Sequence, residues 1–151
     1  MKKLFLVLLF VPLVSFGQSQ MLNGIKLNGP KDFIKKGDYL WTKGNDYILV
    51  QSFKTTMTSD SFISKCEKGS RTTKFIRTIN QELNGKEYTF CLMKGDNGRL
   101  IGQSYVQRGD YLYLITSATY QGELNETNIL DKSLENIFYM FGHMIERIRA
   151  T

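Results

Sequence analysis

Side chains that could carry out chemistry are few in this sequence and lie far apart along it. The single histidine, His143, has no serine or cysteine at a spacing that would make it the base for a nucleophile. Motifs for phosphate-binding loops, nucleophile elbows and clusters of metal ligands are also missing from the sequence. We therefore expect a protein that is not an enzyme and that binds no cofactor or metal. A cleft that contained Asp96, Arg99 and His143 together would favour an enzyme instead.

The only cysteines are Cys66 and Cys91. Their spacing fits no zinc pattern, and two ligands are too few for a structural zinc site. The stretch "TSDSFISKCEKG" predicts a short helix, capped by Ser59 or Asp60, in which Phe62 and Cys66 share an apolar face. Cys91 lies in the predicted strand "KEYTFCLMK". If the helix packs on the face that carries Cys91, an exported chain would form a disulfide there. The alternative is two buried free thiols.

The first residues have the layout of a secretory signal peptide. Two lysines precede an apolar run over residues 4–14, and the small residue Gly17 stands before Gln18. A membrane anchor is the alternative, but the run is shorter than the roughly 20 residues that span a bilayer. The stretch resembles signal peptides of Gram-negative bacteria, so we expect cleavage between Gly17 and Gln18 and export to the periplasm or beyond. Residues 1–17 are then the signal peptide, and residues 18–151 form a single domain.

The chain is mildly basic, with a formal net charge of +6. Two of the positive charges belong to the predicted signal peptide. A charge of this size bears on solubility more than on partners, and nucleic acid is not expected to bind. Five basic residues recur every three positions, namely Lys65, Lys68, Arg71, Lys74 and Arg77. Gly69 should interrupt any helix that would align them, so we expect a solvated surface rather than an anion-binding stripe.

Periodicity in the middle of the chain indicates an antiparallel sheet. Alternating residues predict strands in "DYILVQSFK" and "GDYLYLITSATY", and Asn84-Gly85 predicts a tight hairpin turn. The second strand is apolar on both faces, so it should lie centrally in the sheet. Before these strands, "NGPKDFIKKGDYLWTKGND" is rich in turn residues.

The tripeptide Arg108-Gly109-Asp110 matches a cell-adhesion motif, but Gly109-Asp110 also fits a hairpin turn, which we expect here.

The last segment predicts a long amphipathic helix that Asn125, Thr127 or Asn128 could cap. Its apolar stripe consists of Leu130, Leu134, Ile137, Phe138, Phe141, Met144, Ile145 and Ile148. His143 falls opposite this stripe and should face solvent. The only partner large enough to bury the stripe is the sheet. The expected fold class is therefore α+β, an antiparallel sheet with a short helix after the first strands and the long C-terminal helix packed on the sheet.

Aromatic residues are numerous, and three of them, Trp41, Tyr111 and Tyr113, are candidates for a partner-binding surface. The alternative is that they are half-buried strand residues. We expect an exported accessory module of the cell envelope that binds a protein partner through an aromatic face or a sheet edge. A carrier with a small-ligand cavity beneath the C-terminal helix is the alternative function. We expect no stable membrane insertion after cleavage, and the oligomeric state stays open.

The order of these elements, with Trp41 before "YILVQSF" and "GDYLYLITSATY" before the final helix, resembles the PsbP-like fold that the Ran-binding Mog family shares. The resemblance covers roughly residues 25–148. It implies an antiparallel sheet between helices and a mostly non-catalytic, partner-binding role, without assigning binding residues. The helix-grip fold, which lays a long helix on a sheet around a ligand cavity, is a competing resemblance. The single short helix before the meander favours the PsbP-like fold.

Overall fold

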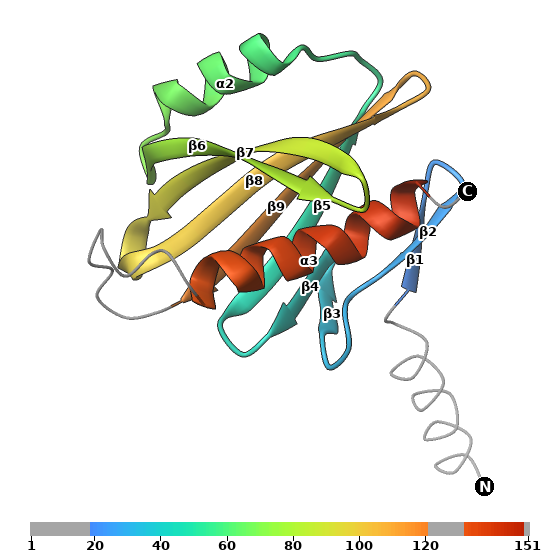
Figure 1. The fold of residues 1–151 in the computed structure, drawn as a ribbon. Coiled ribbons are helices and arrows are strands. Elements are labelled where there is room, and N and C mark those ends of the chain that lie inside the picture. The colour runs from blue at the N-terminus through green and yellow to red at the C-terminus, as the bar shows by residue number, and fades with distance from the viewer. Residues whose placement is uncertain (1–18, 121–131, 150–151) are drawn as a thin grey trace, which may run out of the picture.

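A computed structural model describes residues 19–120 and 132–149. The predicted signal peptide with its cleavage site, Gly17 and Gln18, lies outside these residues, as do the predicted caps of the last helix and Leu130 of its predicted apolar stripe. The elements in chain order are β1 (Ser19–Leu22), β2 (Ile25–Asn28), β3 (Ile34–Gly37), β4 (Leu40–Lys43), β5 (Asp46–Phe53), α2 (Ser59–Lys68), β6 (Thr73–Leu83), β7 (Lys86–Gly95), the 3-10 turn η1 (Asp96–Gly98), β8 (Arg99–Arg108), β9 (Tyr111–Tyr120) and α3 (Lys132–Arg149) (Figure 1).

Most of the strands form one seven-stranded antiparallel sheet in the order β3-β4-β5-β9-β8-β7-β6, and β1 pairs with β2 outside it. Strand β9 lies between β5 and β8, which confirms the central position predicted from its two apolar faces. Asn84 and Gly85 both have positive φ, 52° and 78°, as a two-residue hairpin between β6 and β7 requires. Gly109, at φ 58°, turns the chain between β8 and β9. The tripeptide at 108–110 is therefore part of a hairpin, as expected.

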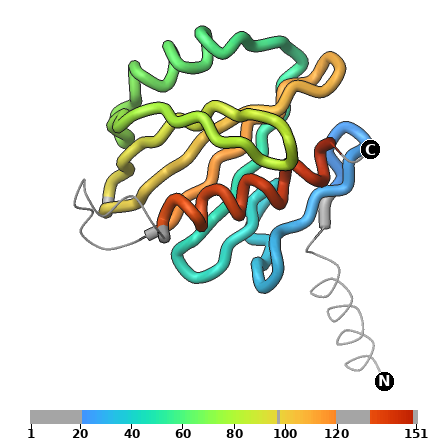
Figure 2. Tube along the Cα trace, in the orientation of Figure 1, coloured from blue at the N-terminus to red at the C-terminus, as the bar shows by residue number. Residues whose placement is uncertain are grey.

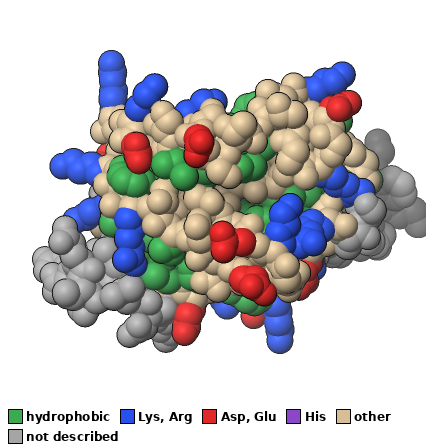
Figure 3. All heavy atoms as spheres, turned by 45° about the horizontal axis from the view of Figure 1, so that its top comes forward, with side chains coloured by type: hydrophobic (Ala, Val, Ile, Leu, Met, Phe, Trp, Pro, Cys, Tyr) green, Lys and Arg blue, Asp and Glu red, His purple; other side chains and the backbone are tan. Residues whose placement is uncertain are grey.

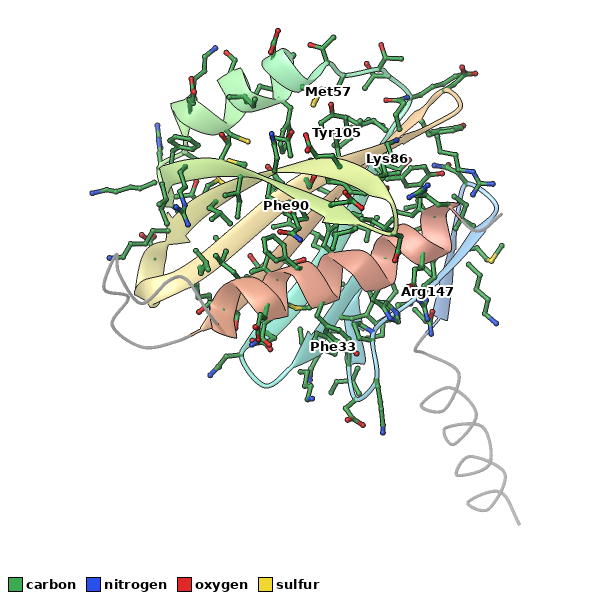
Figure 4. The ribbon with its side chains drawn as sticks, viewed as in Figure 1. Phe33, Met57, Lys86, Phe90, Tyr105 and Arg147 are labelled. Atoms are coloured by element: carbon green, nitrogen blue, oxygen red, sulfur yellow. The ribbon has the colours of Figure 1, made fainter. Side chains whose placement is uncertain are left out.

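Helix α3 packs across β8 and β9 on one face of the sheet and also touches β2. Its fully buried apolar side chains are Ile137, Met140, Phe141, Met144, Ile145 and Ile148. Phe90 of β7 meets Phe138 and Phe141 edge-on, with ring centroids 4.9 and 4.6 Å apart, and Figure 4 shows Phe90 between β7 and the helix. Burial of one such side chain contributes roughly 1.5–3 kcal/mol. The interface of α3 with the sheet is therefore a principal source of stability.

The C-terminal end of α3 is fixed by polar contacts with the strands. His143 Nε2 lies 2.9 Å from the backbone oxygen of Asn28, and Arg147 Nε donates to the Asn28 side chain. Arg108 Nη1 donates to the backbone oxygen of Ile148 at 2.6 Å. His143 is half-buried, so the prediction that it faces solvent is wrong. The reason is β2, which covers this side of the helix.

Helix α2 lies on the opposite face of the sheet and packs mainly on β6 and β7 (Figure 2). Thr58, not the predicted Ser59 or Asp60, caps it by accepting a hydrogen bond from the backbone N–H of Ser61 at 3.2 Å. Gly69, at φ 61°, ends the helix as predicted. Phe62 and Cys66 are buried against the sheet, which confirms the apolar face expected for this helix.

The predicted α+β class is confirmed, with an antiparallel sheet, a short helix after the early strands and a C-terminal helix on the sheet. The turn-rich stretch before β5 differs from expectation because it contains the short strands β3 and β4. Met140 lies beside the predicted apolar stripe and is also buried. Within residues 19–120 and 132–149, no helix combines the length and apolarity that crossing a membrane would need.

The packing of α3 predicts opposite effects for two glycine-to-alanine substitutions. A Cβ at Gly102 in β8 would collide with Cγ2 of Ile137, whereas a Cβ at Gly142 in α3 would meet nothing within 4 Å. Gly102→Ala should destabilise the protein by about 1–3 kcal/mol through overpacking. Gly142→Ala should stabilise it by about 0.5–1 kcal/mol because alanine favours helix. Urea unfolding measures both, and a neutral Gly102→Ala would contradict the close approach of α3 to β8.

The half-buried His143 predicts a pH dependence of stability. Burial lowers the pKa of His143, and the charge of Arg147 acts in the same direction. The unfolded chain therefore takes up this proton at a higher pH than the folded protein. The stabilising contribution of neutral His143 is complete above about pH 6.5 and is lost as the pH falls through the folded-state pKa. We expect the urea midpoint to fall between about pH 7 and about pH 5, and to fall less in His143→Gln. An equal fall of the urea midpoint in the wild type and in His143→Gln would show that other groups cause the pH dependence.

Candidate functional site

A groove of about 510 Å³ opens between α2 and the face of the sheet that α3 does not cover. Its floor comes from β5, β8 and β9, where Ile101, Leu112 and Leu114 contribute apolar side chains. Phe62 of α2 forms part of one wall, and Met57 of the preceding loop forms another. Cavities of this size and apolar character are typical of sites for small molecules.

The groove exists because α2 is too short to cover its face of the sheet. Helix α2 has 10 residues and α3 has 18, so α2 measures roughly 15 Å at 1.5 Å per residue. Leu114 on the floor is only partly buried, and Phe53 at the end of β5 is 44% exposed. With the α2 end of the molecule turned forward, hydrophobic side chains reach the surface between polar ones (Figure 3). This apolar surface would gain roughly 25 cal/mol for each Å² that a bound molecule covered.

Contacts with Tyr105 of β8 hold α2 over the sheet. The rings of Phe62 and Tyr105 meet edge-on at 5.0 Å, and the hydroxyls of Ser59 and Tyr105 lie 3.2 Å apart. Figure 4 shows Met57 and Tyr105 in the space between α2 and the sheet. Tyr105 thus supports α2 from its first turn onward.

The two cysteines meet where α2 packs on the sheet, beside the groove. Cys66 lines the groove, and both thiols are buried and free. A hydrogen bond to Cys66 raises the pKa of Cys91, and burial raises it further, so the Cys91 thiol remains protonated at neutral pH. The expectation that α2 brings Cys66 onto the face of Cys91 is confirmed. The disulfide itself is not formed here and stays a prediction.

Several polar side chains also line the groove, and some of them are already engaged. Gln103 Nε2 donates to Thr116 Oγ1 at 3.0 Å on the floor. Burial raises the pKa of Tyr47, and the Arg99 guanidinium, 5.6 Å from the ring centroid, partly offsets this rise. The Tyr47 hydroxyl therefore stays neutral at physiological pH. Lys65 of α2 brings a positive charge to the rim.

Two of the three aromatic residues proposed as a partner surface are buried in the core. Trp41 is 0% and Tyr113 is 1% exposed, so neither can meet a partner, and this prediction is wrong for both. Gly29 and Phe33 cover the Trp41 ring, since a Cβ at Gly29 would lie 2.8 Å from Trp41 Cδ1. Tyr111 is half-buried and lines a separate cavity beside the β8–β9 turn.

The cavity expected for the carrier hypothesis also lies in a different place. That hypothesis placed a cavity beneath the C-terminal helix, but the side chains of α3 that face the sheet fill that interface. The groove lies on the opposite face, beneath α2.

The residues considered for an enzyme are not assembled into one cleft. His143 contacts Asn28 at the end of β2, while Asp96 lies in η1 at the turn between β7 and β8. The cavity that Asp96 lines includes neither Arg99 nor His143. Among the described residues, no three His, Cys, Asp or Glu side chains gather closely enough to hold a metal ion.

Sequence reasoning missed the floor of the groove. The signal was present in β9, where Leu112, Leu114 and Thr116 point away from the face that receives α3. A second apolar face must be buried by another element, and the only other helix that the sequence predicts is short. A comparison with protein-family models and with curated proteins finds no match, so the role of this groove is argued from its own residues.

The buried thiols predict a compartment-dependent cross-link. Protein recovered from an oxidising compartment should contain the Cys66–Cys91 disulfide and show no free thiol in denaturant, because the two sulfurs already meet. Protein made under reducing conditions should react with a thiol reagent only after unfolding. Closing the loop should stabilise the oxidised form by about 3.5 kcal/mol, or less if the bond is strained. Two thiols in the protein from the oxidising compartment would rule the disulfide out.

Proposed function

We propose that this chain is an exported, non-catalytic binding module that holds a small, largely apolar molecule in the groove between α2 and the sheet. The observation that carries the proposal is the cavity of about 510 Å³ with an apolar floor on the less covered face of the sheet. Ligand sites of small molecules have volumes of about 300–1,000 Å³, apolar walls and a few polar groups that orient the ligand. The groove matches this description in each respect.

Export and the resemblance to the PsbP-like fold remain part of this proposal. The predicted signal peptide precedes β1, which begins at Ser19. A sheet with helices on both faces is what that resemblance implies, and it supports a binding role without choosing the bound molecule. The groove lies beneath the short helix α2, whereas the helix-grip alternative has its cavity beneath the long C-terminal helix.

A protein partner at a sheet edge is the second candidate. Strand β6 has eleven residues, and no further strand pairs with its outer side in the described part of the chain. Such an edge can accept a strand from another chain. However, β6 has a register shift between Phe75 and Arg77, and its exposed residues include Lys74 and Arg77. Bulges and charges are the usual protection against edge pairing, so we favour the groove.

A neutral, environment-sensitive dye tests the proposal. 1-Aminoanthracene should bind the wild-type protein saturably, with a fluorescence rise that marks an apolar site. Leu114→Trp should weaken this binding at least about ten-fold, because the larger side chain rises from the floor into the groove. Tyr139→Trp is the matched control, because it adds the same side chain at a position of α3 that is 57% exposed.

Circular dichroism and urea unfolding must show that both tryptophan variants are folded. Absence of saturable binding to the wild-type protein, or equal binding to folded Leu114→Trp, would refute the proposed ligand site.

A further inference from the structure

A polar pair interrupts the apolar floor of the groove. Gln103 of β8 lies directly opposite Thr116 of β9 in the strand register, and Gln103 Nε2 donates to Thr116 Oγ1 at 3.0 Å. Both side chains line the groove. Thr116 is 9% exposed and Gln103 is half-buried, so neither side chain stands free in solvent.

Apolar residues surround this pair on the same face of the sheet. Side chains two residues apart along a strand share a face, so Ile101 lies beside Gln103, and Leu114 and Ala118 lie on either side of Thr116. Ile101 and Leu114 also line the groove. An apolar molecule that covers the floor from Ile101 to Leu114 therefore covers the polar pair as well.

The bond between the two side chains leaves part of their hydrogen-bonding capacity unused. A glutamine amide has two N–H donors and an acceptor oxygen, and a threonine hydroxyl can donate one hydrogen bond while it accepts another. Within the described part of the chain, the second N–H and the oxygen of Gln103 and the O–H of Thr116 make no further hydrogen bond. A ligand that excludes water from the floor must provide partners for these groups, or binding is weakened by the loss of their hydration.

The surroundings of the pair favour an uncharged ligand group. Among the described acidic and basic residues, only Lys65 lines the groove, and its side chain is exposed. An ionised group would lose its hydration on this floor without meeting an opposite charge, which opposes its binding. A neutral carbonyl or hydroxyl oxygen loses less, and it can accept hydrogen bonds from the Gln103 N–H and the Thr116 O–H.

We infer that the molecule held in the groove carries an uncharged oxygen, of a carbonyl or a hydroxyl, within an apolar body, and that Gln103 and Thr116 bind this oxygen on the floor. This inference rests on the proposed function and adds the chemical class of the ligand. The apolar body supplies affinity through burial. The polar pair supplies specificity, because a site with hydrogen-bonding groups discriminates against analogues that leave those groups unpaired.

Three competitors with one skeleton test the oxygen. Benzophenone, benzhydrol and diphenylmethane carry a carbonyl, a hydroxyl or no oxygen on the carbon between two phenyl rings. Displacement of 1-aminoanthracene gives the dissociation constant of each. We define the oxygen preference as the dissociation constant of diphenylmethane divided by that of benzophenone or benzhydrol. The hydration of the oxygen in water is the same for every variant, so a change in this preference between variants reports on contacts with the protein.

Removal of the polar pair tests the location. Gln103→Met/Thr116→Val replaces both side chains by apolar ones of similar size, and we call it the floor variant. We expect it to lower the larger of the two oxygen preferences at least about five-fold, because the oxygen loses its partners. Diphenylmethane should bind the floor variant at least as tightly as the wild type.

The matched control is Asn80→Leu/Thr89→Val. Thr89 Oγ1 donates to Asn80 Oδ1 at 3.0 Å in a similar pair of opposed strand residues that does not line the groove. This variant should keep the oxygen preference of the wild type. Circular dichroism checks that both double variants are folded.

The carbonyl stretching frequency of bound benzophenone gives a second readout, which the wild-type protein alone can provide. A hydrogen bond to the oxygen lowers this frequency, whereas apolar surroundings leave it near the value in hexane. Infrared difference spectra with benzophenone labelled at the carbonyl carbon separate this band from those of the protein. We expect a frequency below the hexane value in the wild type. A hexane-like frequency in the wild type would contradict the hydrogen bonds that we assign.

The outcomes separate this inference from the proposed function. Saturable dye binding together with the same oxygen preference in the wild type and in the floor variant would overturn the role of Gln103 and Thr116 and leave the apolar site intact. An equal fall in the control variant would overturn that role too. A larger fall for benzophenone identifies the oxygen as a carbonyl, and a larger fall for benzhydrol identifies it as a hydroxyl. Failure of the dye to bind the wild-type protein would instead overturn the proposed function.

Discussion

The burial of one side of α3 against β8 and β9 is the interaction on which the rest of the structure depends. Six apolar side chains of this helix have almost no contact with solvent, and at roughly 1.5–3 kcal/mol each they provide much of the free energy that opposes the entropy of the unfolded chain. The close approach of Gly102 to Ile137 shows how little space remains at this interface. Polar contacts from Asn28 and Tyr88 then fix the last turns of the helix. This face of the sheet is therefore tightly packed where α3 crosses β8 and β9.

The other face receives far less cover, and this difference between the faces creates the candidate site. Strand β9 lies in the middle of the sheet and needs apolar residues on both sides, whereas α2 reaches mainly β6 and β7. Phe62, Cys66, Cys91 and Met93 form a small cluster beneath α2 that holds the helix at one side of the sheet. Leu114 lies at the margin of this cluster and is partly exposed. The groove follows from a wide apolar sheet covered by a short helix.

The fold could be predicted further than the site because its signals are local. The stripe of α3, the Asn84-Gly85 turn and the shared face of Phe62 and Cys66 are all periodic or adjacent in sequence, and the structure confirms them. The four-residue strands β3 and β4 could not be predicted, because turn residues and lysines interrupt the alternating pattern of a strand. The burial of Trp41 depends on cover from Gly29 and Phe33, which alternation within a strand cannot reveal. The groove depends on the length of one helix relative to the width of a sheet, which is a property of the assembled fold.

Side chains that break a local rule without compensation elsewhere are informative in such a fold. Partly exposed Leu114 and Phe53 lose the benefit of burial. Each feature alone is common on protein surfaces. Here Phe53 and Leu114 both line the groove, and a bound apolar molecule would cover them. Violations of local preference tend to collect at functional sites, and their position beside one groove, away from the well-packed α3 face, supports binding there.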